Sequence, residues 1–276
     1  MASICLTICG ITTRVNLIND NGFHIAIKKR YRNFLNPTDN RRPDIDLFIK
    51  ARNNGLNDID ALPSIEVANK TVRIKGNRFT CNIFRNNWFW KGNSTIEKNI
   101  YQFDTLLRLL YSHFLIKDGG FLIHACGINH KNNGYLFAGK SGSGKTTLAR
   151  KSPFLNVLSD ELVGLRLTGG KPLLMGTPFC GEFRKGGQPV SCVLNGIYFL
   201  NKDASPKLIP LPPSLALKKL FKLMLFFDKG SDSVINTQKL LRLAGRYLLN
   251  KKTYQINLAK KTSYKTILKM ISHNGN

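Results

Sequence analysis

The segment from Tyr135 to Pro153, YLFAGKSGSGKTTLARKSP, constrains the fold more than any other stretch of this sequence. An apolar run precedes a glycine-rich turn, and a helix-forming run follows it until Pro153, which cannot continue a helix. The turn matches the P-loop pattern G-x-x-x-x-G-K-[ST], in which backbone N–H groups turn inward on a phosphate. The sequence therefore predicts a strand, an anion-binding loop and a helix N-terminus in succession.

The residues of this P-loop have separate chemical roles. The ammonium group of Lys145 can reach the outer phosphates of a bound nucleotide, and the hydroxyl of Thr146 can bind Mg²⁺. A glycine- and serine-rich surface turn is the alternative interpretation, which the flanking strand and helix patterns disfavour. The expected phosphate-binding residues are Gly139, Lys140, Ser141, Gly142, Ser143, Gly144, Lys145, Thr146 and Thr147.

The chain is long enough for one large domain or two small ones, since it has 276 residues of which 42% are hydrophobic. No apolar run approaches the roughly 20 residues that a membrane span requires. The apolar start, MASICLTICGI, lacks the basic region of a signal peptide. We expect these residues to form a first strand and the protein to be cytoplasmic, without a membrane partner.

The charge is strongly positive, with 42 Lys and Arg against 16 Asp and Glu, a formal net charge of +26. Such an excess favours anionic partners, which include nucleic acid, acidic peptides and nucleotides. The basic residues are spread along the whole chain, and a lysine-rich composition that maintains solubility explains them equally well. Nucleic acid is therefore a possible partner, but not the favoured one.

Six cysteines are scattered without a C-x-x-C pair, which disfavours a zinc site and favours buried thiols.

The β-rich first section spans residues 1–99. In it the sequences TVRIKGNRF and TCNIF alternate between apolar and polar residues, NNWFWKGN is typical of a strand between turns, and PTDNRRPD is typical of a loop. A buried helix is predicted from about Phe103 to Lys117 and should end at Gly119 and Gly120.

The remaining patterns predict further strands and helices in the second section, residues 100–276. GFLIHACGI and GYLFA, joined by NHKNN, predict a hairpin that enters the P-loop, which is unusual because P-loops commonly follow a strand of a parallel sheet. NVLSDE predicts a short strand, and VGLRLTGGKPLLM a second hairpin. Helices are expected at about Ser214 to Phe227 and Val234 to Asn250, then a strand near Tyr254 to Leu258 and a last helix. The apolar run LFKLMLFF is interpreted as a core helix, with an interface as the alternative.

Acidic residues are scarce around the P-loop, where only Asp160, Glu161 and Glu182 occur between Gly119 and Asn201. Mg²⁺ held with a nucleotide needs carboxylates, and phosphoryl transfer to a hydroxyl needs a proton acceptor, so these acids are candidates for both tasks. Alternatively, Asp160 caps a helix or turn and Glu182 is a solvated surface group.

His124 is a further candidate, because the predicted hairpin would bring it beside the P-loop. A histidine within an apolar strand is otherwise a hydrogen-bonded core residue, and both interpretations stay open.

Four motifs, taken in order, resemble the catalytic domain of HPr kinase/phosphorylase. They are HA at His124, GKSGSGKT, LSDE at Leu158 to Glu161, and GTPFCGEFR at Gly176 to Arg184. The chain is more specifically similar to small bacterial HPr-kinase-like proteins found beside peptide-modification genes, including kinases of lasso-peptide precursors. The resemblance spans about Tyr101 to Leu258 and implies an α/β (α+β) fold with a mixed sheet, shared with ATP-dependent phosphoenolpyruvate carboxykinase.

The resemblance also implies roles for individual residues. Asp160 would be the base, helped or oriented by His124, and Lys145 would contact the γ-phosphate of ATP. The implied magnesium ligands are Thr146, Glu161 and Glu182, and the implied phosphate-contacting arginine is Arg184. The second acid of the LSDE motif, Glu161, differs from the family, which commonly has Asp there. Nothing in residues 1–99 resembles the N-terminal domain of HPr kinase, so an acceptor other than HPr is expected.

The expected function is thus Mg-ATP-dependent phosphoryl transfer to a hydroxyl, with a serine of a peptide or protein as the acceptor. A small-molecule hydroxyl is the nearest alternative acceptor. A nucleic-acid-associated P-loop ATPase and a nucleotide-binding protein without turnover are the alternatives from other classes.

Overall fold

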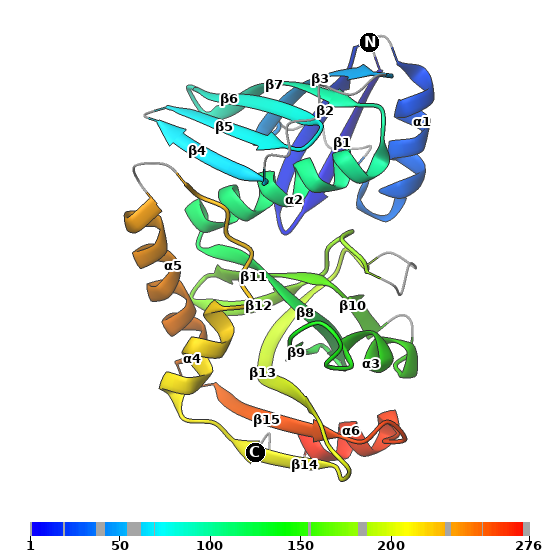
Figure 1. Ribbon diagram of the computed structural model, residues 1–276, viewed down its shortest axis with the longest axis vertical. Helices are drawn as coiled ribbons and strands as arrows, with labels where there is room; N and C mark the ends of the chain where they lie inside the picture. Colours follow the sequence, from blue (N-terminus) through cyan, green and yellow to red (C-terminus); the bar gives the residue numbers. More distant parts are fainter. Residues whose placement is uncertain are drawn as a thin grey trace. The chain divides into compact units, whose positions relative to one another are not determined.

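The computed structural model describes residues 2–18, 20–36, 42–53, 62–68, 70–153, 156–181, 187–229, 233–249 and 251–272. Within them the chain is a mixed α/β protein with two mixed sheets and six α-helices (Figure 1). Contacts divide it into two compact units, of which the first comprises Met1–Lys117 with Phe226–Thr237 and the second Asp118–Leu225 with Gln238–Asn276. Helix α2 (Ile100–Lys117) belongs to the first unit, so this division falls after Lys117, whereas the sequence-based division falls after Asn99.

The first unit is a seven-stranded sheet in the order β1-β2-β3-β7-β6-β5-β4. Its central pairs, β2 with β3 and β3 with β7, are parallel, and the other pairs are antiparallel. The alternating sequence buries one face, as in β5, where Val72 and Ile74 are fully buried and Thr71 and Arg73 are exposed. The strands are β1 (Ala2–Ile8), β2 (Ile11–Leu17), β3 (Ile45–Arg52), β4 (Ser64–Ala68), β5 (Thr71–Gly76), β6 (Phe79–Asn86) and β7 (Phe89–Glu97).

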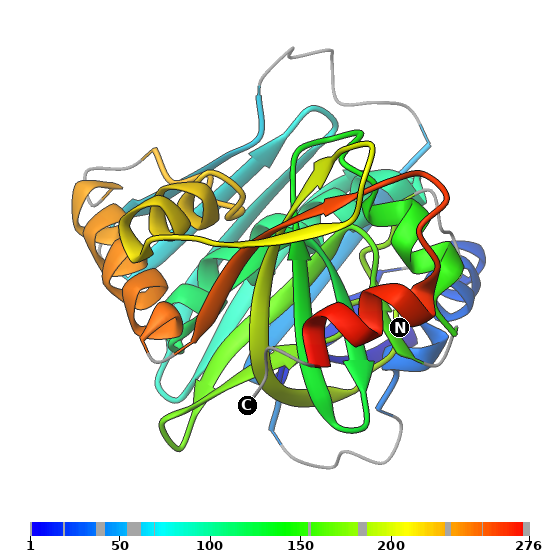
Figure 2. The ribbon, with the colours of Figure 1, turned by 90° about the horizontal axis from the view of Figure 1, so that it is seen from below.

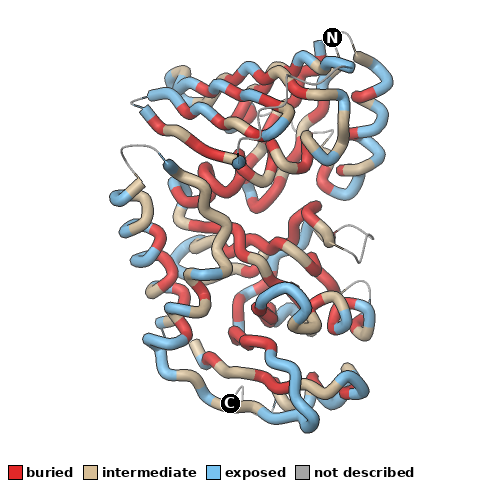
Figure 3. The backbone as a smooth tube through the Cα atoms, viewed as in Figure 1, coloured by how far each residue is buried: buried red, intermediate tan, exposed pale blue. Residues whose placement is uncertain are grey.

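Helix α2 (Ile100–Lys117) packs on the buried face of this sheet, and 12 of its 18 residues are buried. It confirms the expected buried helix but begins three residues earlier, because the Asn99 side chain accepts a hydrogen bond from the Tyr101 N–H at 2.9 Å and caps the helix. In Figure 3 the buried backbone follows α2 and alternates along the strands.

Two features at the start of the chain differ from the sequence-based expectation. The predicted first strand is two strands, β1 and β2, joined by a turn at Cys9 and Gly10 that both have positive φ. Residues expected to be β-rich also form helix α1 (Asn21–Arg30) and the short 3-10 helix η1 (Arg32–Phe34). Asp20 caps α1 by accepting a hydrogen bond from the Phe23 N–H at 2.8 Å. The predicted loop PTDNRRPD falls mostly on residues outside those described.

The second unit is built on the hairpin of β8 (Gly120–His130) and β9 (Asn133–Ala138), as the sequence predicted. Its two turn residues, Lys131 and Asn132, both have positive φ, which suits a tight hairpin. β10 (Val157–Ser159), β11 (Leu162–Thr168) and β12 (Lys171–Met175) follow, and β11 and β12 form the second predicted hairpin. With β13 (Ser191–Lys202), the pairings β8-β11-β12-β13-β9-β8 close a ring of five strands.

Strand β13 (Ser191–Lys202) crosses this unit and pairs in parallel with both β9 and β15 (Lys252–Leu258). β14 (Lys207–Pro210) lies antiparallel to β15 at the sheet edge. Helices α3 (Lys145–Lys151) and α6 (Tyr264–Ser272) share one hydrophobic cluster with β8, β9 and β13, and Figure 2 shows α6 in front of these strands. This cluster anchors the helix that follows the P-loop.

The helix expected from Ser214 to Phe227 is shorter, because α4 (Pro213–Phe221) ends within the apolar run LFKLMLFF. A turn follows α4, and the part of the run around Met224 then pairs with β8, where the Leu225 N–H donates to the Leu122 carbonyl at 2.9 Å. Unpaired backbone groups of β8 are thereby satisfied, and this outweighs the helix propensity of the run. The next helix, α5 (Ser233–Leu248), agrees with the prediction.

All six cysteines are free thiols, and Cys9, Cys81, Cys126 and Cys192 are buried. Cys5 and Cys180 are partly exposed, so the expected burial is correct for four of the six. Among the residues described, no helix is both long and apolar enough to span a membrane.

Candidate active site

The P-loop connects β9 to α3, as its sequence predicts. Gly142 and Gly144 have φ values of 75° and 107°, in the left-handed region that residues with a side chain rarely adopt. Such backbone conformations turn successive N–H groups toward one point and create a concavity that binds anions. Glycine at these two positions is therefore required by the loop geometry.

Lys145 is the first residue of α3, and its side chain folds back onto the loop. Its Nζ donates hydrogen bonds to the carbonyl oxygens of Gly139 at 2.7 Å and Lys140 at 3.0 Å. Burial lowers the pKa of Lys145, while the negative charges of Asp160 and Glu161 act in the opposite direction. The P-loop ammonium group thus lies within electrostatic reach of the acidic pair.

Strand β8 brings the P-loop and the acidic pair together, because it lies between them in the sheet. Ala125 pairs with Ala138, the last residue before the loop, on one side. On the other side the Ala125 N–H donates to the Glu161 carbonyl at 3.0 Å, and His124 pairs with Leu162. Residues between 13 and 38 positions apart in the sequence therefore meet at one end of the sheet.

Asp160 and Glu161 lie between β10 and β11, directly after a register shift in the pairing of β10 with β8, which falls between Val157 and Ser159. Such irregularities interrupt a strand and redirect its side chains, and they are frequent near active sites. Asp160 is 2% exposed, and its Oδ1 accepts a hydrogen bond from the Gly181 N–H at 2.9 Å. This hydrogen bond satisfies one oxygen of the buried carboxylate and connects it to the segment that ends at Gly181.

The described part of the GTPFCGEFR motif packs against this acidic pair. The Ser159 hydroxyl donates to the Phe179 carbonyl at 2.7 Å, and the Leu162 N–H donates to the same oxygen at 3.4 Å. Thr177 donates a short hydrogen bond to the Leu162 carbonyl. The segment from Gly176 to Gly181 therefore positions Asp160 through the backbone on both sides of it.

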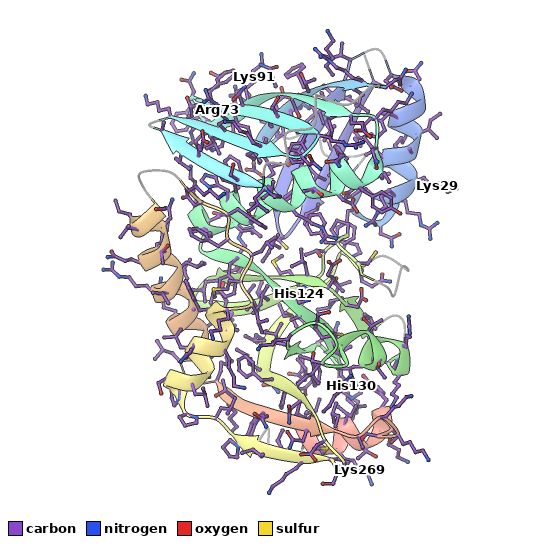
Figure 4. All side chains as sticks on the ribbon, in the orientation of Figure 1. Lys29, Arg73, Lys91, His124, His130 and Lys269 are labelled. Carbon is purple, nitrogen blue, oxygen red and sulfur yellow. The ribbon has the colours of Figure 1, made fainter. Side chains whose placement is uncertain are left out.

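A pocket of about 410 Å³ lies between the P-loop and these acids. His124, Lys145, Thr146, Asp160 and Glu161 all line it, together with loop residues Ser141, Gly142, Gly144 and Thr147. His124 and His130, both labelled in Figure 4, lie at separate places on β8. His124 lines the pocket, whereas His130 pairs with Asn133 next to the hairpin turn. The structure thus brings together the predicted site residues that it describes, apart from Gly139, Lys140 and Ser143, which do not line this pocket.

Gly181 and Lys202 also line the pocket, although the sequence analysis assigned them no role. Lys202 ends β13, whose parallel pairing with β9 places Phe199 beside Ala138. The apolar run before Lys202 is the only local signal, and it does not predict which strand lies alongside. Glu182 and Arg184, predicted to contact metal and phosphate, lie outside the described residues.

The pocket residues could bind Mg²⁺ together with the phosphates of a nucleotide, but not as a metal ion held by protein side chains alone. Within the described ranges, no group of three or more His, Cys, Asp or Glu side chains gathers as a metal site. Mg²⁺ bound with phosphates usually takes one or two carboxylates from the protein. Asp160, Glu161 and the Thr146 hydroxyl share the pocket with the phosphate-binding loop, so the donor set is adequate for that mode.

Comparisons with known proteins give no match, since neither a protein-family model nor a curated protein sequence matches this chain. Function must therefore be inferred from the pocket itself. The pocket combines an anion-binding loop, a buried carboxylate and a histidine within one unit of the protein.

Proposed function

We propose that this protein is a Mg-ATP-dependent phosphotransferase, similar to HPr kinase/phosphorylase, that phosphorylates a hydroxyl group, most simply a serine of a peptide or protein. One observation carries the proposal: the buried carboxylate of Asp160 lines the same pocket as Lys145 and Thr146 of the P-loop. A nucleotide-binding protein needs the loop, whereas transfer to a hydroxyl also needs a proton acceptor beside it.

The proposed chemistry assigns one step to each group. The P-loop N–H groups and Lys145 hold the phosphates of ATP, and the Lys145 ammonium offsets negative charge on the transferring group. As the acceptor oxygen bonds to the γ-phosphorus and the bond to ADP breaks, Asp160 takes the hydroxyl proton. The Gly181 N–H donates to Oδ1 and helps to orient the carboxylate for this step. Bound Mg²⁺ would neutralise phosphate charge and help align the two oxygens.

The remaining assignments also stay proposals. His124 would orient Asp160 or the acceptor from the neighbouring strand β8, whose register places it opposite Leu162. Glu161 and Thr146 would bind Mg²⁺, joined by Glu182, and Arg184 would contact phosphate. Each of these residues occupies a position in one of the four motifs that resemble HPr kinase. Mutation of each residue in turn would test its role.

The fold that HPr kinase shares with phosphoenolpyruvate carboxykinase is likewise proposed for the second unit. The support is the antiparallel entry into the P-loop, since β9 pairs antiparallel with β8 while it pairs in parallel with β13. In common P-loop enzymes the strand before the loop belongs to a helix-connected parallel sheet.

The net charge of +26 is the specific observation that favours a second candidate, a nucleic-acid-associated ATPase. The two functions differ in what accepts the phosphoryl group. A kinase transfers it to a hydroxyl, whereas the ATPase releases it to water, and nucleic acid would stimulate that release.

The test is phosphoryl transfer from γ-labelled ATP to serine-containing peptides by the purified protein. Lys145→Ala should abolish labelling, and Lys171→Ala, which removes a surface lysine of β12 in the same unit, should retain it. ATP binding without any labelled peptide or small-molecule product would overturn the kinase proposal. ATP hydrolysis stimulated by nucleic acid, with no labelled hydroxyl, would favour the ATPase.

A further inference from the structure

The seven-stranded sheet of the first unit has a second face, opposite the one on which α2 packs. We call it the open face, because on β3, β5, β6 and β7 all of its side chains are exposed or partly exposed. They alternate along each strand with buried residues, so that exposed Arg73 lies between buried Val72 and Ile74. Figure 4 labels two residues of the open face, Arg73 and Lys91. A broad part of this sheet therefore stays in contact with solvent.

The open face carries an excess of basic side chains. Its basic residues on the described strands are Arg14, Lys50, Arg52, Arg73, Lys75 and Lys91. Three acids, Asp46, Glu66 and Glu97, also lie on it. The Lys75 Nζ lies 3.6 Å from a Glu66 oxygen, and Arg78 donates a hydrogen bond to Glu97 at 2.8 Å. Six cations against three acids make this face positive, which suits an anionic partner.

Three phenylalanine rings lie on three adjacent strands of the open face. Phe48 is on β3, Phe89 on β7 and Phe84 on β6, and Phe84 is 39% exposed. The Lys91 Nζ lies 5.1 Å from the centre of the Phe48 ring. The Arg42 guanidinium lies 4.1 Å from the centre of the Phe89 ring. Aromatic rings and a planar guanidinium are groups on which nucleobases stack, and here they share one surface with cations.

Two exposed asparagines lie beside these rings. Asn93 of β7 pairs with Phe48 of β3 on one side and with Asn82 of β6 on the other. The Arg73 Nε donates to the Asn82 Oδ1 at 3.2 Å and orients that amide. An amide both donates and accepts hydrogen bonds, as the edges of nucleobases do. The open face therefore has polar groups suited to bases as well as cations suited to phosphates.

This combination of groups favours single-stranded nucleic acid over other anionic partners. The bases of a duplex are stacked inside it, so exposed aromatic rings gain little from them. An acidic peptide would use only the cations, and extended peptides typically bind at the edge of a sheet rather than across its face. Aromatic side chains on a positively charged surface are the common features of proteins that bind single strands.

We infer that the open face of the first unit binds single-stranded nucleic acid. The bases stack on Phe48, Phe84 and the guanidinium of Arg42, and the surrounding cations contact the phosphates. From β2 to β5 the face spans five strands, or about 19 Å, which accommodates a short stretch of nucleotides. The inference goes beyond the proposed phosphotransferase and does not depend on it, because the P-loop pocket belongs to the second unit.

Fluorescence anisotropy with the whole chain, in the absence of ATP, tests this inference. The probes are labelled oligo-uridine and oligo-thymidine single strands of about 12 nucleotides, a duplex of the same length, and a polyglutamate peptide whose charge equals that of the single strands. Both single strands should bind at least about tenfold more tightly than the duplex and the peptide. Their affinity should fall as the salt concentration rises, because binding releases counterions from the phosphates.

Variants of the open face separate stacking from charge. Phe84→Ala should weaken single-strand binding by about fivefold or more, as the loss of one stacked base predicts, whereas Phe84→Tyr keeps a ring and should retain the affinity. Lys50→Ala should lower the affinity and reduce the slope of its logarithm against the logarithm of salt concentration by about 0.7, for one lost phosphate contact. Lys29→Ala is the matched control, because Lys29 is an exposed lysine of α1 in the same unit, and it should change neither quantity.

Equal affinity for single strands and duplex would overturn the inference, since it would show binding by charge alone, and so would the absence of single-strand binding. Tighter binding of polyglutamate would also overturn it and assign the open face to an acidic protein segment. Unchanged single-strand affinity in Phe84→Ala, with thermal melting that shows a folded protein, would place the binding site elsewhere. If that variant does not fold, Phe84→Leu keeps an apolar side chain without the ring, and the same loss of affinity is expected.

Discussion

Replacing Asp160 with asparagine distinguishes a general base from a simple metal ligand. The side chain is 2% exposed, and asparagine keeps both its shape and an oxygen that can accept the Gly181 N–H. The segment from Gly176 to Gly181 should therefore stay in place. Only the negative charge and the ability to take a proton are lost.

The expected loss follows from that single change. Removal of a general base slows transfer by about 10²–10⁴-fold, which is a barrier increase of about 3–5 kcal/mol. Mg-ATP binding should stay within a few-fold of wild type, because the P-loop contacts and Glu161 remain. The Asp160 charge also raises the pKa of Lys145 against the effect of burial, so Lys145 should lose its proton at lower pH in the variant.

The assay measures Mg-ATP affinity by calorimetry and phosphoryl transfer to an acceptor peptide on the same purified protein. Asp118→Asn is the matched control, because Asp118 is an exposed acid of the second unit that pairs with Arg166 away from the pocket. It should change neither quantity. If nucleotide affinity falls in parallel with the transfer rate in Asp160→Asn, the residue is chiefly a metal ligand and the assignment of the base is wrong.

Three further predictions concern protonation, stability and thiol access. Burial lowers the pKa of Lys145 from the ordinary value of 10.5, so ATP affinity should already fall as alkaline pH approaches 10.5. In Lys145→Arg the affinity should fall less over this range, and equal pH profiles for the two proteins would contradict this prediction. Tyr31→Phe removes a short hydrogen bond to the buried Asp104 and should lower the free energy of unfolding by about 1–3 kcal/mol. Urea titration measures this change, and an unchanged unfolding midpoint would show that the hydrogen bond contributes nothing to stability. Burial raises the pKa of Cys81 to about 12, so iodoacetamide should label the partly exposed Cys180 well before Cys81. Mass spectrometry gives the order of labelling, and the reverse order would show that burial does not protect Cys81.

Elements with strong local signals were predictable from the sequence. The β8–β9 hairpin, the P-loop and α3 were predicted because their turns carry glycine or asparagine and their strands are apolar. Helix α1 was missed, because its charged pattern NGFHIAIKKR has a weak apolar face and its cap, Asp20, is the main signal. The extended half of LFKLMLFF could not be predicted, since its conformation depends on pairing with β8, about 100 residues earlier.

The residues of the candidate site likewise divide into those that the sequence predicted and those that it did not. Lys145, Thr146, Asp160 and Glu161 belong to motifs that a single sequence contains, and they line one pocket. Lys202 belongs to no motif, and its position follows from the parallel pairing of β13 with β9, a contact between residues about 60 positions apart. Long-range pairings of this kind leave no periodic pattern in the sequence.

The first unit is assembled from two separate stretches of the chain, which affects how it can be produced and how it folds. The late segment Phe226–Thr237 completes it, because the Ile65 N–H donates to the Phe227 carbonyl at 3.1 Å and the Lys229 N–H to the Ile65 carbonyl at 2.9 Å. Strand β4 contains Ile65 and ends the sheet order, so without this segment the sheet keeps an open edge. During synthesis the ribosome must pass residue 229 before that edge is covered. A fragment cut at Asn99 or Lys117 for expression should therefore aggregate, and the first unit is best produced within the whole chain.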